Sequence, residues 1–126
     1  MIRYAPKKKI LVVDDVASMR KKLRTILEEA GCEVVGEAED GDEAVNLSRI
    51  LKPDLVTMDI VMNRMNGIDA TRELKHECPN IKVIMITQMA KPSNVKESMR
   101  AGAVNFIIKP FDAQSVTRIV KNIFNL

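Results

Sequence analysis

Three carboxylates, one hydroxyl and one ammonium group follow short apolar runs at four places in the sequence. Asp14 and Asp15 follow the first such run, and Asp59, Thr87 and Lys109 follow three later ones. Clustered carboxylates without His or Cys ligands suit a hard cation such as Mg²⁺, which keeps several waters and bridges to phosphate oxygens. An Asp carboxylate can also act as a nucleophile toward phosphoryl groups and form an acyl phosphate. If these side chains meet, they predict phosphoryl transfer to an aspartate.

Each of the other groups would have a task in such a site. Without a cation, the carboxylates would repel one another and an incoming phosphoryl group. Transfer needs mainly positioning and charge neutralisation, which a metal ion, the Lys109 ammonium and the Thr87 hydroxyl can supply to the equatorial oxygens. Each residue taken singly also has a structural explanation, such as helix capping or a turn. The prediction therefore rests on the fact that all of them follow apolar runs.

The apolar runs themselves read as five strands, at residues 10–13, 33–38, 55–58, 83–86 and 106–108. Most are rich in Val and Ile and nearly continuous, which is typical of strands buried on both faces of a parallel sheet. The run 33–38 differs because it contains Glu33, Gly36 and Glu37. It is therefore expected to be an edge strand.

The segments between the runs have the periodicity of amphipathic helices, expected at about residues 16–30, 40–52, 68–77, 93–101 and from 112 onward. Asp40 with Glu43 resembles a capping box, Asp112 is a favourable N-cap, and Gly31 and Gly102 mark helix ends. Strand and helix thus alternate five times, which predicts a parallel sheet with helices on both faces. In such a sheet, ligands bind at the carboxyl ends of the strands, where the polar side chains are placed.

The composition favours one compact globular domain over residues 1–126, without an output domain. The chain has 126 residues, of which 46% are hydrophobic and 29% charged. No apolar run reaches the roughly 20 residues that a membrane span needs, and the apolar stretch after Lys9 is too short for a signal peptide core. We therefore expect a cytoplasmic protein with no membrane association.

Basic residues form clusters at residues 7–9 and again at Arg20, Lys21, Lys22 and Arg24, although the net charge is only +3. The single Tyr and three Phe residues do not interleave with these clusters to form a stacking platform for bases. A solvated helix face is thus the better interpretation, and no nucleic-acid partner is expected. Cys32 and Cys78 lack metal-like spacing and are expected to be reduced, buried thiols.

The sequence resembles the receiver domain of two-component response regulators, most closely the single-domain CheY type. The matching segments are Val12-Val13-Asp14-Asp15, Met58-Asp59-Ile60-Val61-Met62, Met65-Asn66-Gly67, Ile86-Thr87 and Lys109-Pro110-Phe111. The resemblance covers residues 9–124 without an obvious gap. It implies an α/β, flavodoxin-like (βα)5 doubly wound sandwich whose five-stranded parallel sheet has the order 2-1-3-4-5.

The resemblance also implies the roles of the acids. Asp59 would accept a phosphoryl group from a histidine kinase, a histidine phosphotransfer protein or a small donor such as acetyl phosphate. Asp15, Asp59 and the main-chain carbonyl of Val61 would bind Mg²⁺ or Mn²⁺, and Asp14 would act mostly through metal-bound water. The protein would catalyse only its own phosphorylation and dephosphorylation, and would not otherwise be an enzyme.

The implied switch involves residues farther along the chain. Lys109 would pair with the phosphoryl group, and its bond to Pro110 would be cis. Thr87 would move toward the phosphoryl oxygen, and Phe106 would swing inward behind it. An effector would then dock on the face made by the fourth helix, fifth strand and fifth helix, with control of a flagellar motor switch in chemotaxis as the favoured output. A phosphatase is a further candidate partner, and the unphosphorylated protein is expected to be a monomer.

Several residues depart from the family pattern. Asn63 stands where Pro is most frequent, which predicts a more mobile loop after Asp59. Gln88 replaces a small residue and would either crowd the site or offer it an amide. Val61 and Met89 are apolar and cannot orient an attacking water, which predicts slow self-hydrolysis of the acyl phosphate, unless both simply pack. Phe106 lacks the hydroxyl of a Tyr, so it cannot make an output hydrogen bond.

Other functions remain open at this point. One is a carrier within a phosphorelay, and another is a pseudo-receiver that binds partners without phosphate, although the complete set of site residues argues against it. A flavodoxin-like electron carrier would need a hydroxyl- and Gly-rich loop where Asp14 and Asp15 stand. A phosphatase of the haloacid dehalogenase type would need two acids separated by one residue there.

Overall fold

Five parallel strands form one sheet in the computed structural model, which describes residues 6–126 and leaves residues 1–5 outside the described part. The strands are β1 (Lys9–Val13), β2 (Glu33–Ala38), β3 (Leu55–Met58), β4 (Lys82–Thr87) and β5 (Asn105–Ile108). Their order is β2-β1-β3-β4-β5. This confirms the predicted doubly wound, flavodoxin-like architecture.

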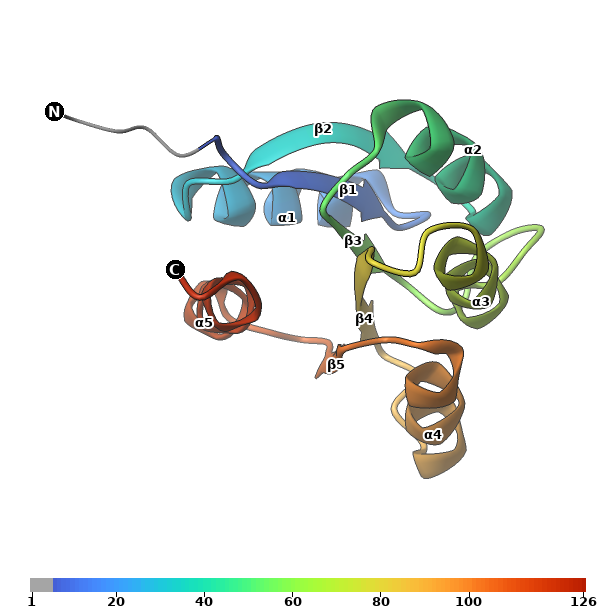
Figure 1. The fold of residues 1–126 in the computed structure, drawn as a ribbon. Coiled ribbons are helices and arrows are strands. Elements are labelled where there is room, and N and C mark those ends of the chain that lie inside the picture. Colours follow the sequence, from blue (N-terminus) through green and yellow to red (C-terminus); the bar gives the residue numbers. More distant parts are fainter. Residues whose placement is uncertain (1–5) are drawn as a thin grey trace, which may run out of the picture.

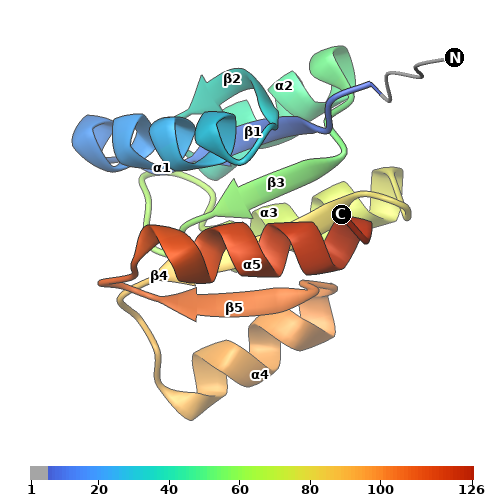
Figure 2. The same ribbon diagram turned by 90° about the vertical axis from the view of Figure 1, so that its left-hand side faces the viewer.

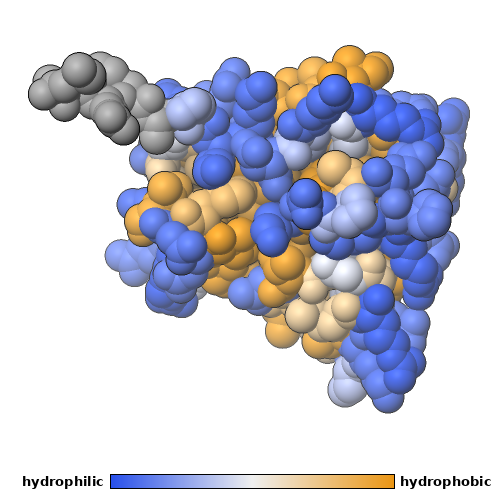
Figure 3. All heavy atoms as spheres, in the orientation of Figure 1, coloured by the Kyte–Doolittle hydropathy of each residue, from blue (hydrophilic) through white to orange (hydrophobic). Residues whose placement is uncertain are grey.

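Helices cover both faces of the sheet (Figures 1 and 2). They are α1 (Ala17–Glu29), α2 (Gly41–Leu51), α3 (Gly67–Glu77), α4 (Pro92–Ala101) and α5 (Ala113–Phe124). Helices α1 and α5 pack on one face, and α2, α3 and α4 lie on the other. Figure 3 views the molecule from the amino ends of the strands and shows hydrophobic residues gathered beside the carboxyl end of α5 within a mostly hydrophilic surface.

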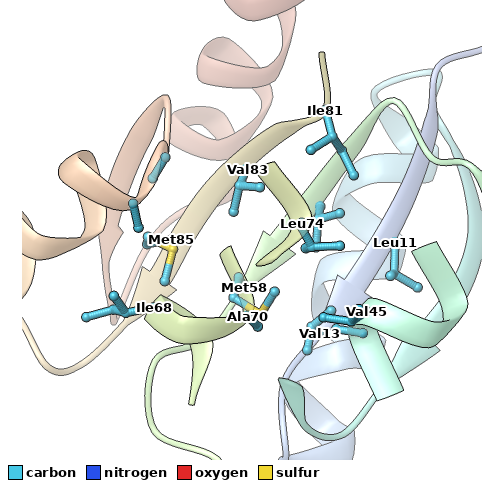
Figure 4. Close-up of a cluster of buried hydrophobic side chains, with 14 of the residues drawn as sticks. Leu11, Val13, Val45, Met58, Ile68, Ala70, Leu74, Ile81, Val83 and Met85 are labelled. Carbon is cyan, nitrogen blue, oxygen red and sulfur yellow. The ribbon is translucent and has the colours of Figure 1, made fainter. Parts of the chain in front are cut away.

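The core is divided by the sheet into two clusters of buried side chains. In β1, Leu11 and Val13 point into the cluster under α2 and α3, part of which Figure 4 shows, whereas Ile10 and Val12 point into the cluster under α1 and α5. All four are at most 1% exposed. Burial on both faces explains why this run is continuously apolar.

Both outer strands depart from continuous burial. Strand β2 is partly exposed along its length, as predicted for an edge strand. Strand β5 forms the opposite edge, and its last residue, Ile108, is 55% exposed. The apolar run 106–108 did not reveal this, because an exposed Ile at an edge has the same local pattern as a buried one.

The predicted capping residues begin their helices as expected. Asp40 accepts a hydrogen bond from the Glu43 main-chain N–H at 2.9 Å, and Asp112 accepts one from Ser115 at 2.7 Å. Gly102 ends α4 with a φ of 112°, in the left-handed region that favours glycine. These local contacts set where each helix starts and therefore where the preceding loop lies.

The prediction of two buried thiols is half wrong. Cys32 is buried, but Cys78, which follows the last residue of α3, is exposed. Its position at a helix end, next to Pro79, places it on the surface, and an isolated Cys has no periodicity from which this could be inferred. None of the helices within residues 6–126 is long and apolar enough to span a membrane.

Candidate phosphorylation and metal site

Four loops at the carboxyl edge of the sheet bring the acidic residues, Thr87 and Lys109 together. Asp14 follows β1, Asp59 follows β3, Thr87 is the last residue of β4, and Lys109 follows β5. Carboxylate oxygens of Asp14, Asp15 and Asp59 lie within 4.8 Å of one another. Because parallel strands end at the same edge, residues up to 95 positions apart in the chain meet here.

The Lys109 ammonium lies between two of the carboxylates. Its Nζ donates to Asp14 Oδ2 at 2.7 Å and to Asp59 Oδ2 at 3.4 Å, and the Lys109 side chain is only 8% exposed. The Lys109-Pro110 peptide bond is cis, as the family resemblance implied. A buried ammonium aimed at the Asp59 carboxylate is placed where it could also reach an oxygen bonded to that carboxylate.

The charge around Asp59 is unbalanced in favour of negative groups. Burial raises the pKa of the Asp59 carboxyl above its ordinary value; the Thr87 hydroxyl and the Lys109 ammonium counteract this shift, and Asp14 adds to it. The Lys109 ammonium contacts two of the three clustered carboxylates, those of Asp14 and Asp59. This all-oxygen donor set fits a hard divalent cation, which would relieve the repulsion.

Glycine is required beside Asp59 because two loops approach each other closely. A Cβ on Gly67 would collide with the main-chain carbonyl of Asp59, and the Gly67 N–H donates to the Ile60 carbonyl at 2.8 Å. Asn66 caps α3 by accepting hydrogen bonds from the Ile68 and Asp69 N–H groups. The Asn66-Gly67 pair of the family motif therefore closes the loop after Asp59 and has a structural role.

Thr87 and Phe106, the two residues expected to move in the switch, are buried and half-buried, respectively. The Thr87 hydroxyl accepts a hydrogen bond from the Met89 main-chain N–H at 3.2 Å, and the residue is 1% exposed. Phe106 is half-buried and packs against the core under α2 and α3. The movements expected of these two residues stay predictions.

The three departures that flank the site are exposed. Val61 is 55% and Met89 40% exposed, and Gln88 between Thr87 and Met89 also faces solvent. The alternative that Val61 and Met89 simply pack in the core is therefore not supported. Among residues 6–126, the Asn63 main-chain N–H donates no hydrogen bond, and the mobility expected of its loop stays a prediction.

Arg20 is a site residue that the sequence reasoning missed. Its Nη1 donates to the main-chain carbonyl of Asp14 at 2.7 Å, while its Nε donates to Glu37 Oε1 at 3.0 Å.

Burial alone would raise the pKa of Glu37, but hydrogen bonds from Arg24 and Arg20 lower it overall. Half of the second basic cluster thus anchors β1 and its loop to β2, and only Lys21 and Lys22 form the expected exposed face.

Known proteins share this sequence and fold. The response regulator receiver domain family matches residues 10–121. The chemotaxis protein CheY of Thermotoga maritima is 47% identical over 92% of this chain and 97% of its own length. CheY of Bacillus subtilis is 44% identical over 93% of this chain and 98% of its own length.

Solved structures give the same assignment. A CheX–CheY–BeF3–Mg²⁺ complex from Borrelia burgdorferi matches with a TM-score of 0.88 at 34% identity, over 93% of this chain and 89% of that one. The response regulator domain of Thermotoga maritima CheB matches with a TM-score of 0.83 at 36% identity, over 95% of both chains. This chain therefore belongs to the response-regulator receiver domain family of two-component signalling, and it is closely related to CheY.

Proposed function

We propose that this protein is a stand-alone, cytoplasmic response regulator that takes a phosphoryl group on Asp59 in a Mg²⁺-dependent reaction and signals in chemotaxis. The observation that carries the proposal is the Asp59 carboxylate, 7% exposed, held between Asp14, Asp15 and the Lys109 ammonium. Two chemotaxis proteins of the CheY type, matched over almost their whole length, support a role in chemotaxis.

In the proposed reaction, an Asp59 carboxylate oxygen bonds to phosphorus as the bond from phosphorus to the donor's leaving atom breaks. The leaving group keeps that electron pair, and a histidine donor returns to neutral imidazole. Lys109 moves its hydrogen bond from the Asp59 carboxylate to a phosphoryl oxygen, and the buried Thr87 hydroxyl turns to another. When bound, Mg²⁺ supplies charge neutralisation at these oxygens; Asp15, Asp59 and the main-chain carbonyl of Val61 would hold it, with Asp14 acting through water.

Intact mass measurement after incubation with acetyl phosphate tests this function. We expect a Mg²⁺-dependent, base-labile gain of one phosphoryl group that is absent in Asp59→Asn. Asp42→Asn, the same substitution in the first turn of α2, should retain the gain. No gain in wild type under any condition would contradict the proposal and favour a pseudo-receiver that binds partners without phosphate.

The output surface we propose is the face of α4, β5 and α5, which lie side by side in Figure 2. Three of its hydrophobic residues are exposed: Met99 on α4, Val104 after it, and Ile108 on β5. Large exposed apolar side chains on one face favour a protein-binding surface. A CheY in complex with CheX is known from Borrelia burgdorferi, which supports a protein effector of the chemotaxis system here, such as a motor switch component.

The phosphoryl donor we propose is a histidine kinase or histidine phosphotransfer protein, and a phosphatase is a further candidate partner. A role as an intermediate carrier in a phosphorelay is the second function compatible with the same site. Passage of the phosphoryl group from Asp59 to a histidine phosphotransfer protein, measured with radiolabelled phosphate, would favour the carrier. A phosphorylation-dependent complex with a motor switch protein would favour direct output.

A further inference from the structure

A pocket lies at the amino ends of β3 and β4, at the opposite edge of the sheet from Asp59. Its volume is about 490 Å³, and its walls come from the carboxyl ends of α2, α3 and α5 and from the segments that lead into β3 and β4. None of its lining residues takes part in the proposed phosphorylation. A volume of this size is within the range of small-ligand sites, roughly 300–1,000 Å³.

The interior wall of the pocket is apolar. It is formed by Pro53, Leu74, Ile81 and Phe124, the first three of which are buried. Figure 3 looks at this end of the molecule and shows the hydrophobic residues beside the carboxyl end of α5 framed by hydrophilic ones. An apolar interior with a polar rim favours a ligand that has an apolar body and a polar end.

The rim carries an excess of positive charge. Arg49 and Glu77 neutralise each other, with Arg49 Nη2 at 2.6 Å from Glu77 Oε1. The Asp54 carboxylate accepts the main-chain N–H at the start of β1 at 2.8 Å. Lys52 and Lys82 form no ion pair within residues 6–126. Asp54 keeps its negative charge in that contact, so Arg49, Lys52 and Lys82 against Asp54 and Glu77 leave the lining with one net positive charge, which complements an anion.

An unpartnered hydroxyl belongs to the same lining. Ser48 of α2 is 8% exposed, and its Oγ has no hydrogen-bond partner among the described residues. The Oγ atom is itself buried, as are the unpartnered hydroxyls of Thr57 and Ser98 away from the pocket, so Ser48 does not indicate what the pocket binds.

We propose that this pocket binds a small organic anion with an apolar body, of the class of medium-chain carboxylates. The apolar body would lie on Leu74, Ile81 and Phe124, where it removes apolar surface from water. The carboxylate would face Lys52 and Lys82 in charge-assisted hydrogen bonds. The proposal does not depend on phosphorylation, because every lining residue is at the other edge of the sheet from Asp59.

Alkylation of Cys78 provides the test, since this exposed thiol lines the pocket whereas Cys32 is buried. Octanoate is the probe, and iodoacetamide is a suitable reagent because it is neutral. At an octanoate concentration about ten times its Kd, only about a tenth of the pockets are free, so alkylation of Cys78 should slow by about tenfold. Acetate, which lacks the apolar body, and hexylamine, which has the opposite charge, should not protect the thiol.

Matched charge variants locate the site. Lys52→Glu/Lys82→Glu should lose the protection, and Lys91→Glu/Lys96→Glu, with the same charge change at exposed lysines at and within α4, should keep it. If circular dichroism shows the first double variant to be unfolded, Lys52→Glu alone, at an exposed position, replaces it. Unchanged protection in Lys52→Glu/Lys82→Glu, or in Lys52→Glu where it replaces the double variant, would overturn the proposal, as would equal protection by acetate. So would protection by a Leu- and Glu-containing peptide but not by octanoate, which would identify a protein-docking groove instead.

Discussion

At the scale of residues, the candidate site is dominated by like charge. Asp14, Asp15 and Asp59 cluster together, Lys109 contacts Asp14 and Asp59, and burial raises the pKa of Asp59 despite that contact. Ionised Asp59 therefore destabilises the metal-free folded protein. The same repulsion favours binding of a divalent cation, because the cation would neutralise the carboxylates and relieve the repulsion between them.

Asp59→Asn should stabilise the protein in metal-free buffer at about pH 7. Because the pKa of Asp59 is raised in the folded state, the unfolded chain loses this proton first as the pH rises. Stability is unaffected by Asp59 below the unfolded pKa, falls as the pH rises toward the folded pKa, and stays reduced above it. The gain should be on the order of 1 kcal/mol for each unit by which the pKa is raised.

Urea unfolding of wild type and Asp59→Asn across pH measures this difference. It should shrink through about pH 4 and vanish below about pH 3, where the carboxyl is protonated in both states. Glu33→Gln, which removes an exposed carboxylate at the start of β2, serves as the control. An Asp59→Asn variant no more stable than wild type at neutral pH would contradict the expected charge repulsion.

Arg20 should affect metal binding without being a ligand. Its hydrogen bond to the Asp14 carbonyl orients the loop that carries two of the acids. Loss of such a supporting contact typically weakens metal binding by about 10- to 100-fold, so Arg20→Met should raise the Kd for Mg²⁺ by about tenfold in calorimetric titration. Lys21→Met removes the same charge from an exposed neighbour and should have little effect. A Kd for Arg20→Met no higher than that for Lys21→Met would contradict the positioning role of Arg20.

At the scale of elements, the loops after β3 and β4 control access to the site. Val61 and Met89 come from these two loops and are exposed, but neither side chain can hold a water molecule by a hydrogen bond. The acyl phosphate on Asp59 would thus be attacked by water that the protein does not orient. Output would last longer than in a receiver with polar residues at these positions.

Val61→Asn and Met89→Glu should speed the loss of the phosphoryl group. A polar side chain that orients or activates water can raise a rate by about 10²- to 10⁴-fold, and we expect at least about tenfold here. The decay of the phosphorylated protein, followed by intact mass after removal of acetyl phosphate, measures this rate. Ile50→Asn, at an exposed apolar residue on α2, is the control. If wild type decays faster than both variants, the proposed slow hydrolysis is wrong.

At the scale of the whole molecule, the fold separates three surfaces. The carboxyl edge of the sheet holds the candidate phosphorylation site, the α4–β5–α5 face carries exposed apolar residues, and the amino edge contains the proposed anion pocket. Receiver family membership also removes the basis for the electron-carrier and dehalogenase-type alternatives. Because the three surfaces are separate, a substitution on one of them should change phosphorylation, effector binding or anion binding without altering the other two.

Met99→Asp should weaken effector binding while leaving phosphorylation intact. Met99 is 45% exposed on α4, so an Asp there disturbs no core but places a charge in the proposed apolar interface. We expect a loss of about tenfold or more in affinity for a motor switch protein, measured with BeF3 and Mg²⁺ present, because burying an unpaired charge is costly. Ile50→Asp, on α2, should bind normally. A normal affinity of Met99→Asp would exclude this part of the face from the interface.

Much of the fold could be predicted from sequence because its determinants are local. Strands buried on both faces must be continuously apolar, and Asp40 and Asp112 cap helices through main-chain groups three residues away. Acids placed directly after β1 and β3 must lie at one edge of a parallel sheet. These rules were sufficient for the element order, the doubly wound architecture and the convergence of the candidate site residues.

The tertiary structure alone decided the features that depend on contacts between distant segments. The role of Arg20 on α1 requires Glu37 on β2, 17 residues along the chain. The exposure of Cys78 and Ile108 depends on what packs beside a helix end and a sheet edge. The anion pocket is formed by three helix ends that come together only in the fold. Local sequence specifies what each segment is, whereas long-range packing determines which groups remain accessible to a partner.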